Sequence, residues 1–272
     1  MNRFMLIAAF ACLMTACGKD ATDHPDHAKI ISLVTDWEDR GSEIDIPSDY
    51  TVSVGERAFT CSGTVNAIEE LFAAGQYPLR VYNTAPGITV EGRNATADYA
   101  AGVAGWFFTG ADNITVERDR EYALTIAMRQ QVRQLTLELE IGGDARDHLT
   151  SVDAALSGVA GAWEIDSDRP SGGAVTVTPL FVQSGDTYSA VIRLLGITGS
   201  SQSLSLTLHF AGGNPSSYTV TSELSARLAA FNEEKKNPLT LSSVLVVTPT
   251  QGGFVSAISD WTAGSTSTGV AE

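Results

Sequence analysis

Histidine and carboxylate side chains are the groups in this sequence that could ligate a metal or move a proton. Of the four histidines, two frame the segment His24-Pro-Asp-His27, which follows Asp23. Imidazole and carboxylate groups can ligate Zn²⁺, but a structural zinc site needs a fixed tetrahedral shell of ligands. Residues 20–26 are polar and unpatterned, which is typical of a solvated tether. We therefore predict no bound metal and no cofactor.

Two carboxylate pairs, Glu69/Glu70 and Asp166/Asp168, could supply a general acid and a general base. Nothing in the sequence places either pair across a cleft, so both are interpreted as solvated surface charge. His209 lies in an alternating segment and is predicted to point outward. The sequence lacks a glycine-rich phosphate loop and the G-x-S-x-G, H-E-x-x-H and C-x-x-C motifs. These observations predict a protein without catalytic residues, which is not an enzyme.

The N-terminus predicts a covalent modification instead. Arg3 precedes an uncharged apolar run over residues 5–14, which is shorter than the roughly 20 residues that span a bilayer. The following Met14-Thr-Ala-Cys17 resembles the bacterial lipobox, in which the cysteine is acylated on its thiol and becomes the first residue of the mature chain. We predict a lipoprotein signal peptide over residues 1–16, lipid on Cys17 and a tether over residues 17–29. An ordinary signal peptide that contains a cysteine is the alternative.

The remaining cysteines do not predict a disulfide. Cys12 is removed with the signal peptide, and lipid on Cys17 would leave Cys61 without a partner. The residues around Cys61 are apolar at alternate positions, so this thiol is predicted to be a small buried hydrophobe. An exported domain without disulfides must be stabilised by its hydrophobic core.

The composition supports such a core and limits the partners. The chain has 272 residues, of which 43% are hydrophobic and 18% are charged, so it is not a disordered chain. Its formal net charge is −15. An acidic surface repels phosphate backbones, so nucleic acid is excluded as a predicted partner.

The elements that must carry these residues are strands. Apolar and polar residues alternate in many segments, and glycine-containing turn signals separate them. The clearest alternating segments are residues 50–54, 122–128, 135–141, 204–210 and 218–221. This pattern predicts an all-β protein of antiparallel sandwich type. Two short amphipathic helices are expected over residues 66–74 and 222–231, because apolar residues recur there at helical spacing.

The best internal boundary is the pair Gly142-Gly143, which follows a strong strand pattern. It divides the chain into a predicted N-terminal β-sandwich over residues 30–143 and a C-terminal β-sandwich over residues 144–272. Each part contains two of the four tryptophans, namely Trp37 and Trp106, then Trp163 and Trp261.

Four segments together resemble the fimbrillin-associated lipoproteins of Bacteroidales, the anchor and accessory subunits of the type V pilus. They are residues 24–50, which contain Thr35-Asp-Trp37; Gly75-Gln-Tyr-Pro-Leu-Arg-Val-Tyr-Asn83; residues 128–137 with Leu156-Ser-Gly-Val-Ala-Gly161; and residues 244–261, which end in Ile258-Ser-Asp-Trp261. These segments are spread over nearly the whole mature chain in the family's order.

The resemblance implies two tandem transthyretin-like sandwiches and a non-enzymatic role in a cell-surface fimbria. Cys17 is the only functional residue that the resemblance assigns, as the site of lipidation. Other fimbrial subunits are the implied partners, and the implied location is the outer membrane, with the chain held by its lipid at the cell surface. Trp37 and Trp261 are expected to be core residues.

Anchor, tip and minor subunits remain open on this resemblance. Shaft subunits are cleaved after a basic residue beyond their first strand, and a neighbour's C-terminal strand then fills the groove. The first predicted strand covers residues 30–37, and Arg40 after it is preceded by Glu38 and Asp39, which disfavour such cleavage. Residues 262–272 contain few apolar side chains and form a poor donor strand. We therefore expect an anchor that begins at Cys17 and keeps its first strand.

Two other functions fit a β-sandwich on a lipid tether. A surface glycan-binding lipoprotein would need several exposed aromatic side chains on one face, and Trp106-Phe-Phe108 is the only aromatic cluster that could supply them. The sequence does not decide whether this cluster is core or surface. A structural surface protein unconnected with fimbriae is the third possibility.

Overall fold

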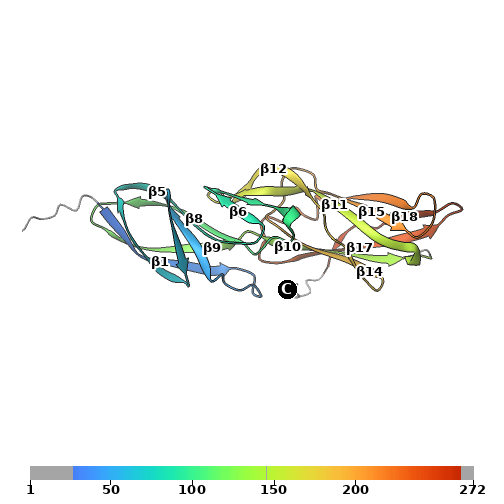
Figure 1. Ribbon diagram of the computed structural model, residues 1–272, viewed down its shortest axis with the longest axis horizontal. Coiled ribbons are helices and arrows are strands. Elements are labelled where there is room, and N and C mark those ends of the chain that lie inside the picture. Colours follow the sequence, from blue (N-terminus) through green and yellow to red (C-terminus); the bar gives the residue numbers. More distant parts are fainter. Residues whose placement is uncertain (1–26, 145, 265–272) are drawn as a thin grey trace, which may run out of the picture.

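The computed structural model describes residues 27–144 and 146–264. The predicted signal peptide, the lipidation site Cys17 and most of the tether lie outside these residues. Within them the chain is built of strands, with two short 3₁₀ turns, η1 (Tyr99–Ala101) and η2 (Arg146–His148), and no α-helix. The all-β prediction is confirmed. The molecule is elongated, and the strands gather in two lobes along its long axis (Figure 1).

The N-terminal lobe is one seven-stranded sheet that folds over on itself. Its strand order is β3 (Arg57–Ser62), β2 (Asp49–Val54), β5 (Gly75–Asn83), β8 (Phe108–Val116), β9 (Glu121–Gln130), β1 (His27–Asp39) and β4 (Val65–Ala73). Strands β8 and β9 pair only at Phe108↔Gln130 and Thr109↔Arg129, and they separate beyond these residues. The two ends of the sheet come near one another at the β3–β4 turn, so the sheet is nearly barrel-shaped and encloses an apolar core.

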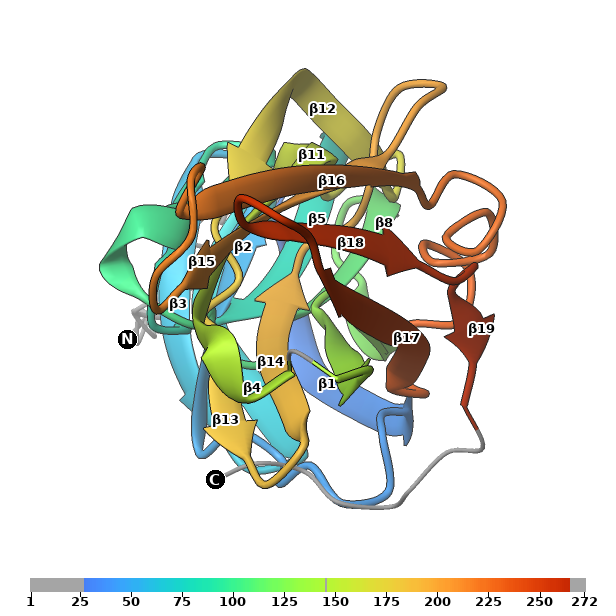
Figure 2. The same ribbon diagram turned by 90° about the vertical axis from the view of Figure 1, so that its right-hand side faces the viewer.

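The C-terminal lobe contains two six-stranded sheets. The first has the order β13 (Val182–Ser184), β14 (Thr187–Leu194), β10 (Arg133–Gly142), β17 (Leu239–Pro249) and β18 (Phe254–Ile258), with β19 (Thr262–Ala263) also paired to β17. The second has the order β16 (Ser217–Glu223), β15 (Ser203–Phe210), β11 (Leu149–Glu164), β7 (Asn94–Ala97) and β6 (Ile88–Glu91), with β12 (Arg169–Val177) also paired to β11. Viewed along the long axis, β16 lies on one side and β14 and β17 on the other (Figure 2). The apolar residues of both sheets form one core between them.

Strand β1 lies in the interior of its sheet. It pairs antiparallel with β4 along one edge and parallel with β9 along the other. Ile30 is 1% exposed and Leu33 is fully buried, so the strand also fills the core of the lobe. Trp37 packs edge-on against Phe108, with ring centroids 5.5 Å apart. The strand predicted over residues 30–37 is confirmed, and it extends to His27–Asp39.

Both predicted helices are wrong. Residues 66–74 fall almost entirely in β4, where Ile68 and Phe72 are buried and Leu71 is 46% exposed. A spacing of four residues returns to the same face in a strand as well as in a helix, so Ile68 and Phe72 fit both structures. Only Leu71 favoured the helix, and it lies on the outer face of the sheet.

The second predicted helix, over residues 222–231, begins as the end of β16 and continues as a series of turns. The amphipathic pattern nevertheless identifies the buried residues correctly, because Leu224, Leu228 and Phe231 are all buried. Backbone hydrogen bonds mix two spacings, since Arg227 N and Leu228 N both donate to Leu224 O. Buried apolar residues at helical spacing thus pack against the core without a regular helix.

The predicted domain ranges, 30–143 and 144–272, stay a prediction. The C-terminal lobe begins before Gly143, because β10 pairs with β14 and β17, which are strands of that lobe. The hairpin β6–β7 also joins the C-terminal lobe through β11, although it precedes β8 in the chain. In the part of the chain that the structure describes, no helix has the length and apolar character needed to cross a bilayer.

Candidate functional site

Three segments that are distant in sequence meet where the chain passes from β9 to β10. They are residues 130–133, residues 163–168 at the end of β11 and in the turn before β12, and residues 224–237 between β16 and β17, which we call the junction segment. Their side chains form a largely buried polar group between the lobes, in which Asp168 keeps 36% of its side chain exposed. We call Gln131, Trp163, Asp168 and Lys235 the junction cluster.

Lys235 is the buried amine of the junction cluster. It is only 7% exposed. Its Nζ donates a hydrogen bond to Gln131 Oε1 at 2.7 Å and lies 3.1 Å from the ring centroid of Trp163. Burial lowers the pKa of Lys235 well below its ordinary value, while the nearby Asp168 acts in the opposite direction. An amide oxygen and an aromatic face therefore replace the water that would otherwise solvate this amine.

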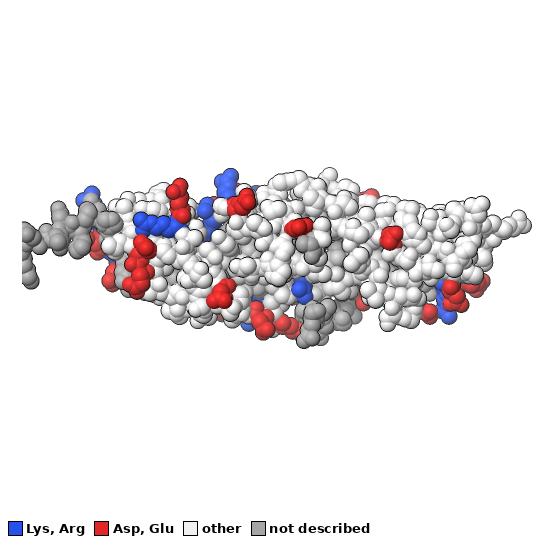
Figure 3. All heavy atoms as spheres, in the orientation of Figure 1, with Lys and Arg blue, Asp and Glu red and all other residues white. Residues whose placement is uncertain are grey.

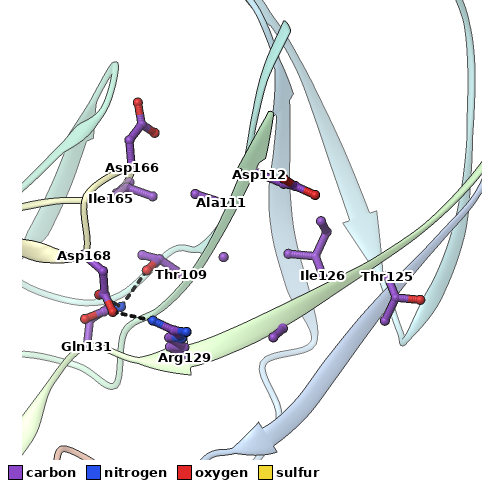
Figure 4. Close-up of a pocket in the computed structure, with 12 residues that line it drawn as sticks. Thr109, Ala111, Asp112, Thr125, Ile126, Arg129, Gln131, Ile165, Asp166 and Asp168 are labelled. Atoms are coloured by element: carbon purple, nitrogen blue, oxygen red, sulfur yellow. Dashed lines mark hydrogen bonds and ion pairs between the residues drawn. The ribbon is translucent and has the colours of Figure 1, made fainter. Parts of the chain in front are cut away.

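Asp168 is the hydrogen-bond acceptor at the centre of the cluster. Its Oδ1 accepts from Gln131 Nε2 at 2.8 Å and from Trp163 Nε1 at 3.1 Å. Its Oδ2 accepts from Arg129 at 2.9 Å, and Figure 4 shows Arg129 and Gln131 directed toward the carboxylate. Burial by itself raises the pKa of Asp168, but the hydrogen bonds to its charged form outweigh it and the pKa is lowered. Asp168 is thus held as an anion by three donors.

Gln130 connects the end of β1 to the junction segment. Its Oε1 accepts a hydrogen bond from Gly41 N at 2.9 Å, and its Nε2 donates to Lys235 O at 2.8 Å. Gly41 is closely enclosed, because a Cβ built there would lie 2.9 Å from Ile44 Cδ1 and 3.0 Å from Lys236 O. The Arg40 side chain donates to the main-chain oxygens of Ile44 and Gly41. The chain after β1 is therefore fixed against the junction.

Arg133 holds the junction segment from the opposite side. The residue is 4% exposed, and burial lowers its pKa. Its guanidinium donates to the main-chain oxygens of Asn237 at 2.6 Å, Phe231 at 3.1 Å and Ala230 at 3.2 Å. The buried guanidinium thus supplies hydrogen-bond donors to three main-chain carbonyl oxygens of a segment that is not paired in a sheet.

Two clefts border the cluster. One of about 680 Å³ is lined by Lys235, Trp163 and Asp168, together with residues of both charge signs. Another of about 200 Å³ opens between β8 and β9 and is lined by Asp166, Asp168 and Thr109, among others (Figure 4). Nowhere in residues 27–144 and 146–264 do three His, Cys, Asp or Glu side chains gather closely enough to hold a metal.

The two predicted carboxylate pairs have different surroundings. Glu69 and Glu70 are exposed on β4, and Glu70 forms an ion pair with Arg57 at 3.3 Å, so their interpretation as surface charge is confirmed. The same interpretation is wrong for Asp168, which belongs to the junction cluster. Asp166 is a partner of Arg80 on β5, with oxygen–nitrogen distances of 2.5 and 2.7 Å. This ion pair also links the two lobes.

The histidines that the structure describes are not gathered at one site. His209 points outward from β15 with its side chain 39% exposed, as predicted, and its Nε2 lies 2.8 Å from Asp153. His148 packs against Phe254, with ring centroids 5.0 Å apart. His24 lies outside the described residues, as does Cys17, whose lipidation stays a prediction.

The aromatic cluster is core rather than surface. Phe107 and Phe108 are fully buried, and half-buried Trp106 carries the Arg193 guanidinium 4.3 Å from its ring centroid. These side chains do not form the exposed platform that glycan binding would require of them. Trp37, Trp261 and Cys61 are buried, as predicted, and burial raises the pKa of the Cys61 thiol.

The distribution of charge differs between the lobes on the face shown in Figure 3. Charged side chains gather over the N-terminal lobe and at the far tip, while most of the surface between them carries few charges. The N-terminal lobe shows acidic and basic groups side by side rather than a continuous basic patch.

The chain was compared with known proteins by sequence and by structure. No protein-family model and no curated protein sequence matches it. By structure it is similar to a candidate adhesin from Bacteroides ovatus, with 12% identity, a TM-score of 0.60 and coverage of 84% of this chain and 90% of that chain. It is also similar to the fimbrial anchor protein Mfa2 from Porphyromonas gingivalis, with 10% identity, a TM-score of 0.54 and coverage of 86% and 98%.

The chain shares its fold with these surface proteins. A candidate polysaccharide-binding protein from Bacteroides thetaiotaomicron has the same fold, with 12% identity, a TM-score of 0.50 and coverage of 87% of this chain and 98% of that chain. At this level of identity the likeness establishes the fold alone. It agrees with the sequence resemblance to fimbrial lipoproteins, which rests on different observations.

Proposed function

We propose that this protein is a lipid-anchored surface subunit of a fimbria, that it holds the assembly to the outer membrane, and that it has no catalytic activity. The fold shared with the fimbrial anchor Mfa2 supports this role. So does the sequence around Cys17, which resembles a lipobox. Other fimbrial subunits would be its partners at the cell surface.

The position of β1 is the observation that carries the proposal. A lipid on Cys17 would be joined through a short polar tether to this strand, which is paired along both edges. Removing the strand would expose the core around Ile30 and Leu33 and break two hydrogen-bonded ladders. A pull on the tether is therefore resisted by the whole sheet, as an anchor requires.

The chain just after β1 is poorly suited to cleavage at Arg40. The Arg40 side chain is bound to main-chain oxygens, and Gly41 is buried with its N–H donated to Gln130. A protease that recognises arginine must draw this side chain into its own pocket, which requires both contacts to break. These contacts add to the acidic residues Glu38 and Asp39 in favouring a retained strand, and a retained strand favours an anchor over a shaft subunit.

The proposal includes the finer description of the fold. We infer that the chain contains two tandem transthyretin-like sandwiches, within the predicted ranges 30–143 and 144–272. The folded-over sheet of the N-terminal lobe and the paired sheets of the C-terminal lobe support this description.

Replacement of the lipidation site tests the role directly. Cys17→Ala should give a precursor that takes up no labelled fatty acid and is lost from the outer-membrane fraction. Cys61→Ala is the matched control, because that cysteine is buried in the lobe, and it should leave labelling unchanged. Full membrane retention of the Cys17→Ala protein would contradict lipid anchoring.

A further inference from the structure

Lys235 and Gln131 bring an amine and a carboxamide into contact inside the protein. The two residues are far apart in the chain, yet Lys235 Nζ lies 2.7 Å from Gln131 Oε1. Gln131 is 1% exposed and Lys235 is 7% exposed, so water has little access to the pair. The amine is thus hydrogen-bonded to the oxygen that is attached to the amide carbon Cδ, which is the electrophilic atom of the group.

The surroundings of Lys235 favour a nucleophilic amine. Burial disfavours the ammonium form and lowers the pKa of Lys235, and desolvation in this manner is a known means of activating lysine. The ring of Trp163 covers the amine on one side at 3.1 Å from its centroid. The amine is therefore restricted to the side on which Gln131 lies.

The surroundings of Gln131 favour loss of its amide nitrogen. Gln131 Nε2 donates to Asp168 Oδ1 at 2.8 Å and to Thr109 Oγ1 at 2.8 Å, and both partners are visible in Figure 4. A carboxylate at the leaving nitrogen can accept a proton from the attacking amine and return it to that nitrogen. Fixed positions for the amine, the amide and the carboxylate replace the encounter of free reactants.

We propose that Lys235 and Gln131 are a modification site at which the protein forms an intramolecular isopeptide bond. Lys235 Nζ attacks Gln131 Cδ, and the new Nζ–Cδ bond forms as the Cδ–Nε2 bond breaks. Asp168 carries one proton from Nζ to Nε2, and Nε2 leaves as ammonia. The step is a transamidation, which needs no oxidant, reductant or other reactant.

The bond would join the connection between the lobes covalently to the C-terminal lobe. Gln131 lies in the connection from β9 to β10, and Lys235 lies in the junction segment of the C-terminal lobe. Cys61 is the only cysteine among residues 27–144 and 146–264, and it is free. A cross-link between residues so distant in sequence restricts the unfolded chain, as a disulfide would.

Peptide mapping of the full-length protein after trypsin digestion tests the proposal. Trypsin should release residues 130–133 and 228–236 as one branched peptide, whose mass is the sum of the two less one ammonia, and it should not cut after Lys235. The digest is independent of lipid on Cys17, so its result does not depend on the fimbrial role.

Variants assign the bond to these two side chains. Lys235→Met and Gln131→Met should each abolish the branched peptide, and Asp168→Asn should slow its formation at least tenfold in freshly synthesised protein. Lys236→Arg is the matched control, because the neighbouring Lys236 pairs with Asp39 at the surface and arginine keeps the trypsin site while removing the amine, so this variant should retain the branched peptide. Separate peptides and cleavage after Lys235 in the folded wild-type protein would overturn the proposal and leave a hydrogen bond only.

Discussion

The core of the C-terminal lobe is buried and the junction cluster is largely so, but different interactions hold them together. The core consists of apolar residues from two sheets, such as Leu137 and Leu206, which alternate along their strands. The junction cluster consists of charged and polar side chains from three separate segments, each with named partners. The core depends on burying enough apolar volume, while the cluster depends on particular pairs of atoms. A substitution should therefore destabilise the core by removing apolar volume and the cluster by removing a hydrogen-bond partner.

The largest effect is expected in the core. Leu137 is fully buried on β10, and Leu137→Ala should reduce the free energy of unfolding by about 2–5 kcal/mol, because it removes apolar contacts and leaves a cavity. Urea denaturation followed by circular dichroism measures the loss. Val246→Ala on the outer face of β17, where Val246 is 43% exposed, is the control and should cost far less. Equal losses for the two variants would mean that the core is not where the lobe is stabilised.

A smaller and pH-dependent effect is expected at Asp168. Asp168→Ala leaves Trp163 Nε1 without its acceptor and Gln131 Nε2 with Thr109 Oγ1 alone, and it should cost about 1–3 kcal/mol at neutral pH. The pKa of Asp168 is lowered in the folded protein, so its stabilisation is present above the ordinary carboxyl pKa of about 3.9. It is lost as the pH falls through the lower folded-state pKa.

Denaturation of wild type and Asp168→Ala across a pH series checks this prediction. The difference in unfolding free energy should be constant from neutral pH to about pH 5 and should narrow below about pH 4. Asp147→Ala, at a side chain that is 91% exposed, serves as the control and should change stability little at neutral pH. A difference that widened toward acid pH would contradict the assignment of Asp168 as a stabilised anion.

An effect of similar size, caused by close packing rather than by lost hydrogen bonds, is expected where β1 meets the junction. Gly41→Ala places a methyl group 2.9 Å from Ile44 Cδ1 and 3.0 Å from Lys236 O, so neighbours must move at a cost of about 1–3 kcal/mol. Gly173→Ala has no atom within 4 Å of the added group and is the matched control. Thermal unfolding of both variants compares them. If Gly41→Ala were as stable as Gly173→Ala, the close packing after β1 would be disproved.

The strands were predictable from the sequence because burial on one face imposes a period of two. Residues 135–141 and 204–210 alternate without exception, and both segments are strands. The pattern did not distinguish strand from helix where apolar residues are four positions apart, as Ile68 and Phe72 are in β4, because both structures place such residues on one face. It also failed in the junction segment, where buried Leu224, Leu228 and Phe231 pack without a helix.

The junction cluster could not be predicted from the sequence. Lys235 lies in the run Glu233-Glu-Lys-Lys236, which has the composition of a solvated surface. Its burial depends on Trp163 and Gln131, which are distant in the chain and come together only in the folded protein. The sequence shows Asp168 as one of a carboxylate pair, but its spacing does not indicate the three hydrogen-bond donors that surround it. Local periodicity records which face is buried, and it carries no information about such long-range pairs.

The N-terminus of the mature protein on the cell surface tests the central claim most directly. An anchor must keep β1, because loss of that strand would separate the lipid on Cys17 from both lobes. Mass spectrometry of surface-exposed material should therefore find a chain that begins at lipid-modified Cys17 and still contains residues 30–37. Surface material that begins at Gly41 would show that the protein is cleaved like a polymerising subunit and would contradict the anchor role.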